Sequence, residues 1–187
     1  MTTSALLRPV RAKVFVPLLF GVLSLFVTMA NHARAQQAPE NQLKAALIYN
    51  FMLFTEWPVA GLASNEVLTL CALKSGPVSD ALIQLQKKTV GNHELRFKLL
   101  AEQDSLQSCK VLYLDDDEHQ RPAQIRKKLE GLSVLTISDR ERAIDEGAMI
   151  AIAVDNNRFV FEVNASSARQ AGFTISSKLL RLARKVW

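Results

Sequence analysis

VLTLCAL, at Val67–Leu73, is an apolar run of strand length, and the segment behind it, Val78–Gln86, has the apolar spacing of a helix. Short apolar runs of this kind are typical of strands buried inside a parallel sheet. Strands that alternate with helices along a chain pair in parallel, with the helices packed on the sheet faces. This stretch therefore predicts an α/β fold.

The alternation continues toward the C-terminus. The apolar patterns predict strands at Leu95–Leu100, Lys110–Leu114, Ser133–Ile137, Met149–Val154 and Arg158–Val163. A helix is predicted over His119–Glu130. Asp155-Asn156-Asn157, between the last two strands, is typical of a hairpin turn. We expect a three-layer α/β sandwich with a mostly parallel mixed sheet and one antiparallel hairpin at its edge.

Upstream of the first strand, Leu43–Phe54 is apolar almost all round, which predicts a helix buried on most of its faces. It should end at Glu56-Trp57-Pro58, because the residue before a proline is pushed out of helical backbone geometry. No linker rich in glycine, serine or proline divides residues 36–187, so we expect them to form a single domain.

Residues 1–35 have the three parts of a secretory signal. Arg8, Arg11 and Lys13 precede the apolar run Val14–Ala30, and a small-x-small sequence ends at Ala35. The alternative is a retained membrane anchor, for which a run of this length is short. We expect a signal peptide cleaved after Ala35 and a periplasmic protein that is not integral to the membrane.

Charge is unevenly spread along the 187 residues, whose net charge is +5. Residues 1–35 carry four basic and no acidic groups, so residues 36–187 have a net charge of only +1. Residues 36–162 sum to −4, and the remaining residues contribute +5. The folded domain therefore lacks the uniformly cationic surface that a nucleic-acid binder needs.

The basic C-terminal segment has amphipathic spacing and predicts a helix from Ser176. The candidate partner-binding residues are Lys178, Arg181, Arg184 and Lys185, and the opposite apolar face comprises Leu179, Leu182, Ala183 and Val186. One interpretation is a docked terminal helix whose cations are solvated near its C-terminal end. The other is a basic face that meets an acidic partner or an anionic lipid surface.

Two cysteines, Cys71 and Cys109, lie in the region after the signal. An oxidising compartment permits them to form a disulfide, and the alternative is a pair of buried thiols. Because the sequence has neither a Cys-x-x-Cys motif nor a His/Cys cluster, we expect no zinc site and no thioredoxin-type chemistry.

Asp115-Asp116-Asp117-Glu118, next to His119, is the one acidic cluster that resembles a metal or acid-base site. It follows a predicted strand at the edge where α/β sheets bind ligands, but acidic residues are also expected at a helix N-terminus. We favour the capping interpretation. His93 is interpreted as a solvated turn residue, and Asn164 as the cap of the helix that follows it.

No nucleophile elbow, phosphate-binding loop or dinucleotide motif is present in the sequence. We therefore expect no catalytic residues, no metal and no cofactor, and a protein that is not an enzyme. A small-molecule-binding or accessory module of an envelope signalling or transport system remains open as a function, with its ligand at the carboxyl edge of the sheet.

Two long motifs resemble the YfiR/HmsC family of periplasmic regulators. They are Lys44-Ala-Ala-Leu-Ile-Tyr-Asn-Phe51 with Phe54 and Glu56-Trp57-Pro58, and Phe161-Glu-Val-Asn164 with Ala168-Arg-Gln-Ala-Gly-Phe173 and Ile175–Ala183. Between them, Leu68–Cys71 and Val134–Asp139 fit the core strands of the family. The resemblance covers essentially all of residues 36–187.

The resemblance implies a small periplasmic α/β protein that represses an inner-membrane diguanylate cyclase by binding its periplasmic sensor domain, which lowers cyclic di-GMP and biofilm formation. It also implies a homodimer. Regulatory members can carry a second cysteine pair, which is missing after Cys109 in this sequence.

Overall fold

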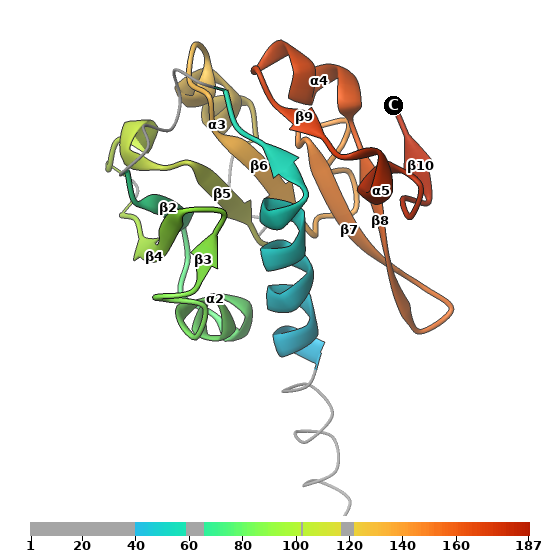
Figure 1. The fold of residues 1–187 in the computed structure, drawn as a ribbon, viewed down its shortest axis with the longest axis horizontal. Coiled ribbons are helices and arrows are strands. Elements are labelled where there is room, and N and C mark those ends of the chain that lie inside the picture. The colour runs from blue at the N-terminus through green and yellow to red at the C-terminus, as the bar shows by residue number, and fades with distance from the viewer. Residues whose placement is uncertain (1–39, 59–65, 102, 117–121) are drawn as a thin grey trace, which may run out of the picture. The chain divides into compact units, whose positions relative to one another are not determined.

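The computed structural model describes residues 40–58, 66–101, 103–116 and 122–187. Their main feature is a sheet of eight strands in the order β10-β8-β7-β6-β5-β2-β4-β3 (Figure 1). These strands are β2 (Leu68–Ala72), β3 (Thr89–Val90), β4 (His93–Leu99), β5 (Val111–Leu114), β6 (Leu135–Ser138), β7 (Ile150–Asp155), β8 (Arg158–Val163) and β10 (Lys185–Val186). The predicted signal peptide lies outside the described residues.

Five neighbouring strands, β4, β2, β5, β6 and β7, run parallel, and β7 and β8 form the expected antiparallel hairpin. Asn156 and Asn157 form its turn with positive φ values of 47° and 59°, which asparagine tolerates better than most residues. The prediction of a mostly parallel mixed sheet is confirmed. The hairpin is not the outermost element, because β10 pairs with β8 in parallel beyond it.

One face of the sheet is covered by the helix at residues 40–53, by α2 (Pro77–Ile83) and by α4 (Ala165–Gln170). From the helix, Ile48, Phe51 and Met52 are fully buried. They belong to one core cluster with Leu70, Tyr113 and Ile137, which point to this face of their strands. The apolar segment after residue 40 therefore folds as predicted.

The opposite face carries α3 (Pro122–Leu129), which lies within the helix predicted over His119–Glu130, and residues 119–121 of that prediction lie outside the described residues. Its Ile125 packs in a second cluster with Cys71, Leu112 and Val134. These strand residues alternate with those of the first cluster, as residues on opposite faces of a sheet must. Helices therefore cover both faces, which confirms the three-layer architecture.

The C-terminal segment differs from the helix predicted there. The helix α5 begins after Ser176 as expected, but it contains only Ser177–Leu180. The chain then turns, Arg184 N donates to Phe161 O at 2.8 Å, and β10 follows. Pairing with β8 supplies backbone hydrogen bonds that a solvated helix end would not have, so this long-range contact overrides the local helical spacing.

Two short strands, β1 (Thr55–Glu56) and β9 (Thr174–Ile175), form a separate antiparallel pair. They connect the end of the first helix to the segment that precedes α5. No helix within the described part of the chain is long and apolar enough to cross a membrane.

Candidate functional site

The sheet has a topological switch point between β2 and β5. From β2 the chain adds β4 on one side of the sheet, and then adds β5, β6 and β7 in succession on the other side. Where the direction of winding reverses in this way, the connections diverge from the carboxyl ends of the two central strands and leave a crevice, which is where open α/β sheets bind ligands.

A cavity of about 170 Å³ occupies this crevice. Its lining residues come from the carboxyl ends of β2, β5 and β6 and from the start of α2. They are Ala72, Leu73, Lys74, Gly76, Pro77, Val78, Ser79, Tyr113, Asp115 and Asp139. The walls are thus mainly apolar on the β2–α2 side and polar on the β5–β6 side.

Asp139 and Tyr113 form the buried polar part of the cavity. Asp139 Oδ2 accepts a hydrogen bond from Lys44 Nζ at 2.7 Å, and the Asp139 side chain is only 8% exposed. Burial, then the charge of Asp139, and then a hydrogen bond with the Asp139 side chain raise the pKa of the Tyr113 phenol, so it stays protonated and can donate that hydrogen bond to Asp139.

Asp115 is the member of the predicted acidic cluster that lines this cavity. Asp116 is exposed, whereas Asp117, Glu118 and His119 lie outside the described residues. Within the described parts of the chain no group of three or more His, Cys, Asp or Glu side chains could hold a metal ion. The capping interpretation of the cluster stays a prediction.

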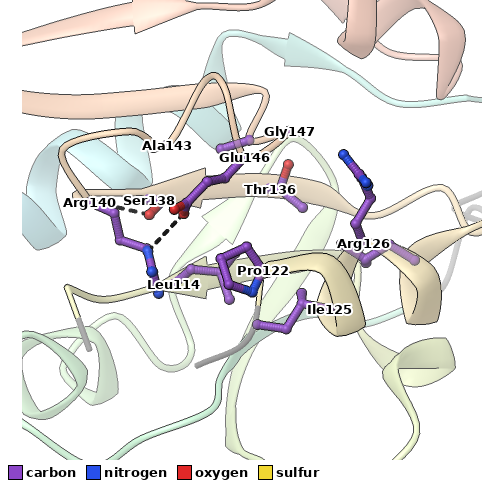
Figure 2. Close-up of a pocket in the computed structure, with 12 residues that line it drawn as sticks. Leu114, Pro122, Ile125, Arg126, Thr136, Ser138, Arg140, Ala143, Glu146 and Gly147 are labelled. Atoms are coloured by element: carbon purple, nitrogen blue, oxygen red, sulfur yellow. Dashed lines mark hydrogen bonds and ion pairs between the residues drawn. The ribbon is translucent and has the colours of Figure 1, made fainter. Parts of the chain in front are cut away.

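A second cavity lies beneath α3 on the other face of the sheet and is much smaller, at about 40 Å³ (Figure 2). Pro122 and Ile125 of α3 form one side, and the segment after β6 forms the other. At its edge Arg140 Nε and Glu146 Oε2 are 2.9 Å apart. This space holds no more than a few water molecules.

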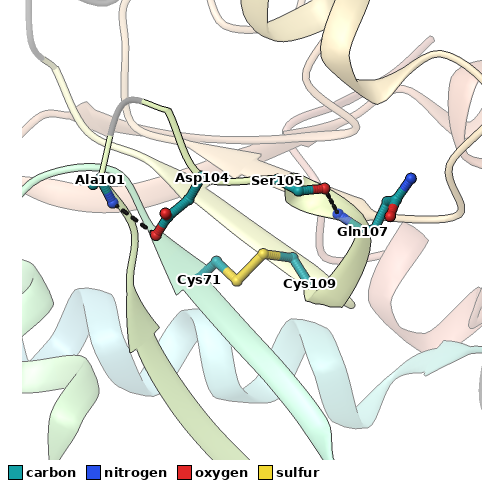
Figure 3. The surroundings of a disulfide bond; sticks show 6 residues. All are labelled: Cys71, Ala101, Asp104, Ser105, Gln107 and Cys109. Carbon is teal, nitrogen blue, oxygen red and sulfur yellow. Dashed lines mark hydrogen bonds between the residues drawn. A yellow bond between two sulfur atoms is a disulfide. The ribbon is translucent and has the colours of Figure 1, made fainter.

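Cys71 and Cys109 form a disulfide, as predicted (Figure 3). It joins β2 to the residue that follows the short helix η1 (Leu106–Ser108), and their Cα atoms are 5.8 Å apart. Both residues are almost fully buried in the second core cluster. Nearby, Asp104 accepts a hydrogen bond from Ala101 N at 3.1 Å, which ties together the connection to η1.

The four predicted partner-binding cations are all exposed, but their contacts differ. Arg184 donates to Glu162 Oε1 from Nε at 3.1 Å and from Nη2 as well, and Lys185 Nζ lies 3.1 Å from the centroid of the Trp187 ring. Lys178 and Arg181 lie in and directly after α5, at the solvent-exposed side of the segment.

Apolar side chains are exposed in the same part of the molecule. Leu182, which was predicted to lie on a docked helix face, is 74% exposed. Phe54 is 38% exposed, and its carbonyl oxygen accepts a hydrogen bond from Ser176 N at 2.9 Å. We use the name C-terminal surface for Lys178, Arg181 and Leu182.

Two smaller predictions can also be checked. Asn164 caps α4, since its Oδ1 accepts a hydrogen bond from Ser167 N at 2.9 Å. His93 is the first residue of β4 rather than part of the turn, and its Nδ1 lies 2.8 Å from Glu66 O. Neither residue lines the cavity at the switch point.

The central polar residues of this cavity were missed by sequence reasoning. Lys44 and Asp139 are separated by 95 residues, and Tyr113 lies within an apolar strand. The available signal was that Asp139 and Asp115 each follow a predicted parallel strand, because the carboxyl ends of such strands share one edge.

Comparison with known proteins identifies one family and a few related folds. A family model described as YfiR/HmsC-like matches residues 41–184. The fold is similar to the crystal structure of a conserved domain protein from Vibrio cholerae O1 biovar El Tor str. N16961, with a TM-score of 0.52 and 11% identity over 79% of this chain. The chain spans 60% of that protein's length, and the likeness concerns the fold alone.

An ABC domain in complex with L-Trp from Streptococcus pneumonia is a more distant match, with a TM-score of 0.46 and 12% identity. The alignment covers 65% of this chain and 55% of the other.

Proposed function

Because the chain belongs to the YfiR/HmsC-like family, a family of periplasmic regulators without catalytic activity, we propose that it represses an inner-membrane diguanylate cyclase. In this proposal the chain binds the periplasmic sensor domain of the cyclase and holds it in its inactive state. Binding lowers cyclic di-GMP and biofilm formation to the extent that the chain prefers the inactive state over the active one.

The observation that carries the proposal is the match of the family model to residues 41–184, which covers nearly all of the described domain. Export is a part of the same proposal: residues 1–35 are removed after Ala35, and the domain acts in the periplasm, where its disulfide is stable. Mass spectrometry of the exported protein tests this step, and an intact Met1 would contradict it.

The C-terminal surface is the proposed contact with the sensor domain. Lys178 and Arg181 supply positive charge that attracts an acidic surface, and the neighbouring Leu182 supplies an apolar anchor that is already exposed. Arg184, also named from the sequence, is committed to Glu162, and Lys185 is stacked on Trp187. We therefore infer that Arg184 and Lys185 stabilise β10, and that Lys178 and Arg181 contact the partner.

The test is a deletion strain in which cellular cyclic di-GMP is measured by mass spectrometry. Deletion should raise cyclic di-GMP, and the wild-type gene should restore it. The double variant Lys178→Glu/Arg181→Glu should fail to restore it although the protein is folded and exported, because the attraction to the sensor domain is reversed.

A matched control is Lys98→Glu/Lys127→Glu, which makes the same change in net charge at exposed residues of β4 and α3. This variant should restore the wild-type level. If deletion leaves cyclic di-GMP unchanged, the function is wrong. If both double variants repress equally well, the function stands and the C-terminal surface is excluded.

A further inference from the structure

The strand β4 is paired along only part of its outer side. There β3 pairs with the first two residues of β4, and Leu95 N donates to Lys88 O at 2.8 Å. The chain enters this pairing at Lys87, directly from the turn after α2, so no described strand lies beside the second half of β4. We use the name β4 edge for the outer side of Arg96–Leu99.

Backbone groups of Phe97 and Leu99 point toward the β4 edge. Successive residues of a strand direct their N–H and C=O groups to opposite neighbours. Leu100 N donates to Ala72 O of β2 at 2.9 Å, so the even-numbered residues here face β2. Phe97 and Leu99 therefore face outward, as Leu95 does, and their outward groups make no hydrogen bond to any described residue. Each of the two residues offers a donor and an acceptor to an added strand.

The side chains of the β4 edge determine which segment fits it. Arg96 and Lys98 are exposed on one face of the sheet, and Phe97 and Leu99 lie on the other. Leu99 is 47% exposed. Glu94 shares the face of Arg96, but it lies in the part already paired with β3. Because the side chains of neighbouring strands contact each other on each face, a fitting segment has acidic residues on one face and apolar residues on the other.

A second copy of this chain does not fit the β4 edge. Pairing two such edges would bring Arg96 and Lys98 of both copies together, and like charges on neighbouring strands destabilise a sheet. Charged residues on an exposed edge oppose self-association in this way. Lys87 and Lys88 are also exposed, so four basic residues and one acidic residue lie between positions 87 and 99. This charge attracts an acidic segment of a different protein.

We propose that the β4 edge binds an extended acidic segment of another protein, which adds to the sheet as a strand in line with β3. The backbone of the segment pairs with Phe97 and Leu99, and its carboxylates lie beside Arg96 and Lys98. In this mode of recognition, main-chain hydrogen bonds supply affinity and the alternating side chains supply specificity. β4 and β10 are near opposite ends of the strand order, so this contact is separate from the one proposed for the sensor domain.

The experiment measures binding of fluorescent peptides to the purified protein by fluorescence anisotropy. The acidic probes are peptides of about six residues, a usual strand length, that alternate glutamate or aspartate with valine, isoleucine or phenylalanine. In the basic probes, lysine replaces each acidic residue. The acidic probes should bind, and the basic probes should bind more weakly by about tenfold or more.

N-methylated probes separate strand pairing from attraction by charge alone. One carries N-methyl groups on its apolar residues, and the other carries them on its acidic residues. One of these two sets of amides faces β4 in either strand direction, so one of the two probes should lose about tenfold or more in affinity. Attraction by charge alone would leave both probes as tight as the parent peptide, since N-methylation does not change the charge.

Variants of the protein test the basic side chains. Arg96→Glu/Lys98→Glu should weaken binding of the acidic probes by about tenfold or more, because the charge at the edge is reversed. The matched control Lys127→Glu/Arg158→Glu makes the same change in net charge at exposed residues of α3 and β8 and should bind like the wild type. Circular dichroism verifies that each variant is folded.

A second pair of variants tests the backbone. Leu99→Pro removes one outward N–H, and proline is accepted where the N–H of an edge strand faces solvent. This variant should bind the acidic probes more weakly than Leu99→Ala, which loses the same apolar side chain but keeps the N–H. The charge-reversal pair still decides the proposal if Leu99→Pro does not fold.

The proposal is wrong if no acidic probe binds, if both N-methylated probes bind as tightly as their parent, or if the charge-reversal variant binds like its control. Analytical ultracentrifugation tests the other occupant. A dimer that dissociates in Leu99→Pro but not in Leu99→Ala would assign the edge to a second copy and would overturn the proposal. Repression of a cyclase is tested with Lys178 and Arg181, so the two proposals can fail separately.

Discussion

Asp139 at the switch-point cavity and Glu162 of β8, which contacts the C-terminal segment, are each paired with a basic residue, and the two pairs differ in their surroundings. At the cavity, the Asp139 side chain is 8% exposed, and it interacts with Lys44 and with Tyr113. At the C-terminus, Glu162 is 17% exposed. Its Oε1 accepts from Arg184, and its Oε2 accepts from Trp187 Nε1 at 3.1 Å.

The two carboxylates both have partners, and they differ in how far they are shielded from water. The Glu162 side chain is partly accessible to water. Its two oxygens nevertheless accept hydrogen bonds from Arg184 and Trp187, which hold β10 against β8. Asp139 lies where water is largely excluded, and its partners are Lys44 of the first helix and Tyr113 of β5. Loss of a charged partner should therefore cost more stability at Asp139 than at Glu162.

The largest expected effect comes from removing Lys44, the cation that pairs with Asp139. Lys44→Met leaves the Asp139 carboxylate buried without its charged partner, and the free energy of unfolding should fall by about 3–5 kcal/mol. Urea denaturation followed by circular dichroism measures this change. Adding Asp139→Asn to the same chain should restore most of the lost stability, because the uncompensated charge is then gone.

The corresponding C-terminal variant, Arg184→Met, sharpens the comparison. Its pair with Glu162 is 43% exposed on the arginine side, so the loss should be at most about 1 kcal/mol. Equal losses for the two variants would mean that solvent screens both pairs alike, and the distinction between the two regions would fail.

The next largest effect is expected at the disulfide, which is on the face of the sheet opposite the helix at residues 40–53. The bridge links residues 38 apart and anchors β2 to the start of β5, the two strands whose carboxyl ends bound the cavity. Cys71→Ala/Cys109→Ala should lower the free energy of unfolding by about 2–4 kcal/mol.

Reduction of the wild-type protein with dithiothreitol should reproduce this loss in urea denaturation, once a thiol assay shows two free cysteines. The double variant, which has no bridge to reduce, should be unaffected by the reductant. A wild-type protein of unchanged stability after full reduction would show that the second core cluster holds β2 and β5 without the bridge.

The fold was largely predictable because each core strand is a short apolar run between polar segments. Leu68–Ala72, Val111–Leu114 and Leu135–Ser138 all lie within two residues of their predicted bounds. The C-terminal helix was wrong because the spacing of Leu179, Leu182 and Val186 is local information. The pairing of β10 with β8 is a contact across more than 20 residues, which the spacing does not contain.

The cavity could be placed from the sequence only in outline. The acidic run Asp115–Glu118 after one predicted strand pointed to the carboxyl edge of the sheet, although the capping interpretation was favoured and Asp139 was not singled out. The pairing of Lys44 with Asp139 depends on how the first helix crosses that edge, which apolar periodicity does not specify. The interaction of Tyr113 with Asp139 depends on the pairing of β5 with β6, which no spacing in the sequence indicates.

The smallest expected effect is the pH dependence of the C-terminal contact. The hydrogen bond from Arg184, and after it that from Trp187, lower the pKa of Glu162 below its ordinary value of 4.5. A carboxyl with a lowered pKa in the folded state stabilises the protein above its unfolded-state pKa, and this contribution is lost as the pH falls through the lowered value. The contribution should not exceed about 1 kcal/mol, because the pair is partly solvated.

The measurement compares wild type with Glu162→Gln by urea denaturation from pH 7 down to pH 3. The difference in the free energy of unfolding should be constant down to about pH 5 and should shrink below that, since protonated Glu162 resembles glutamine. Salt should reduce the difference at pH 7, because the charges are near the surface. A difference that grows on acidification would contradict a lowered pKa and would remove the structural role assigned to this carboxylate.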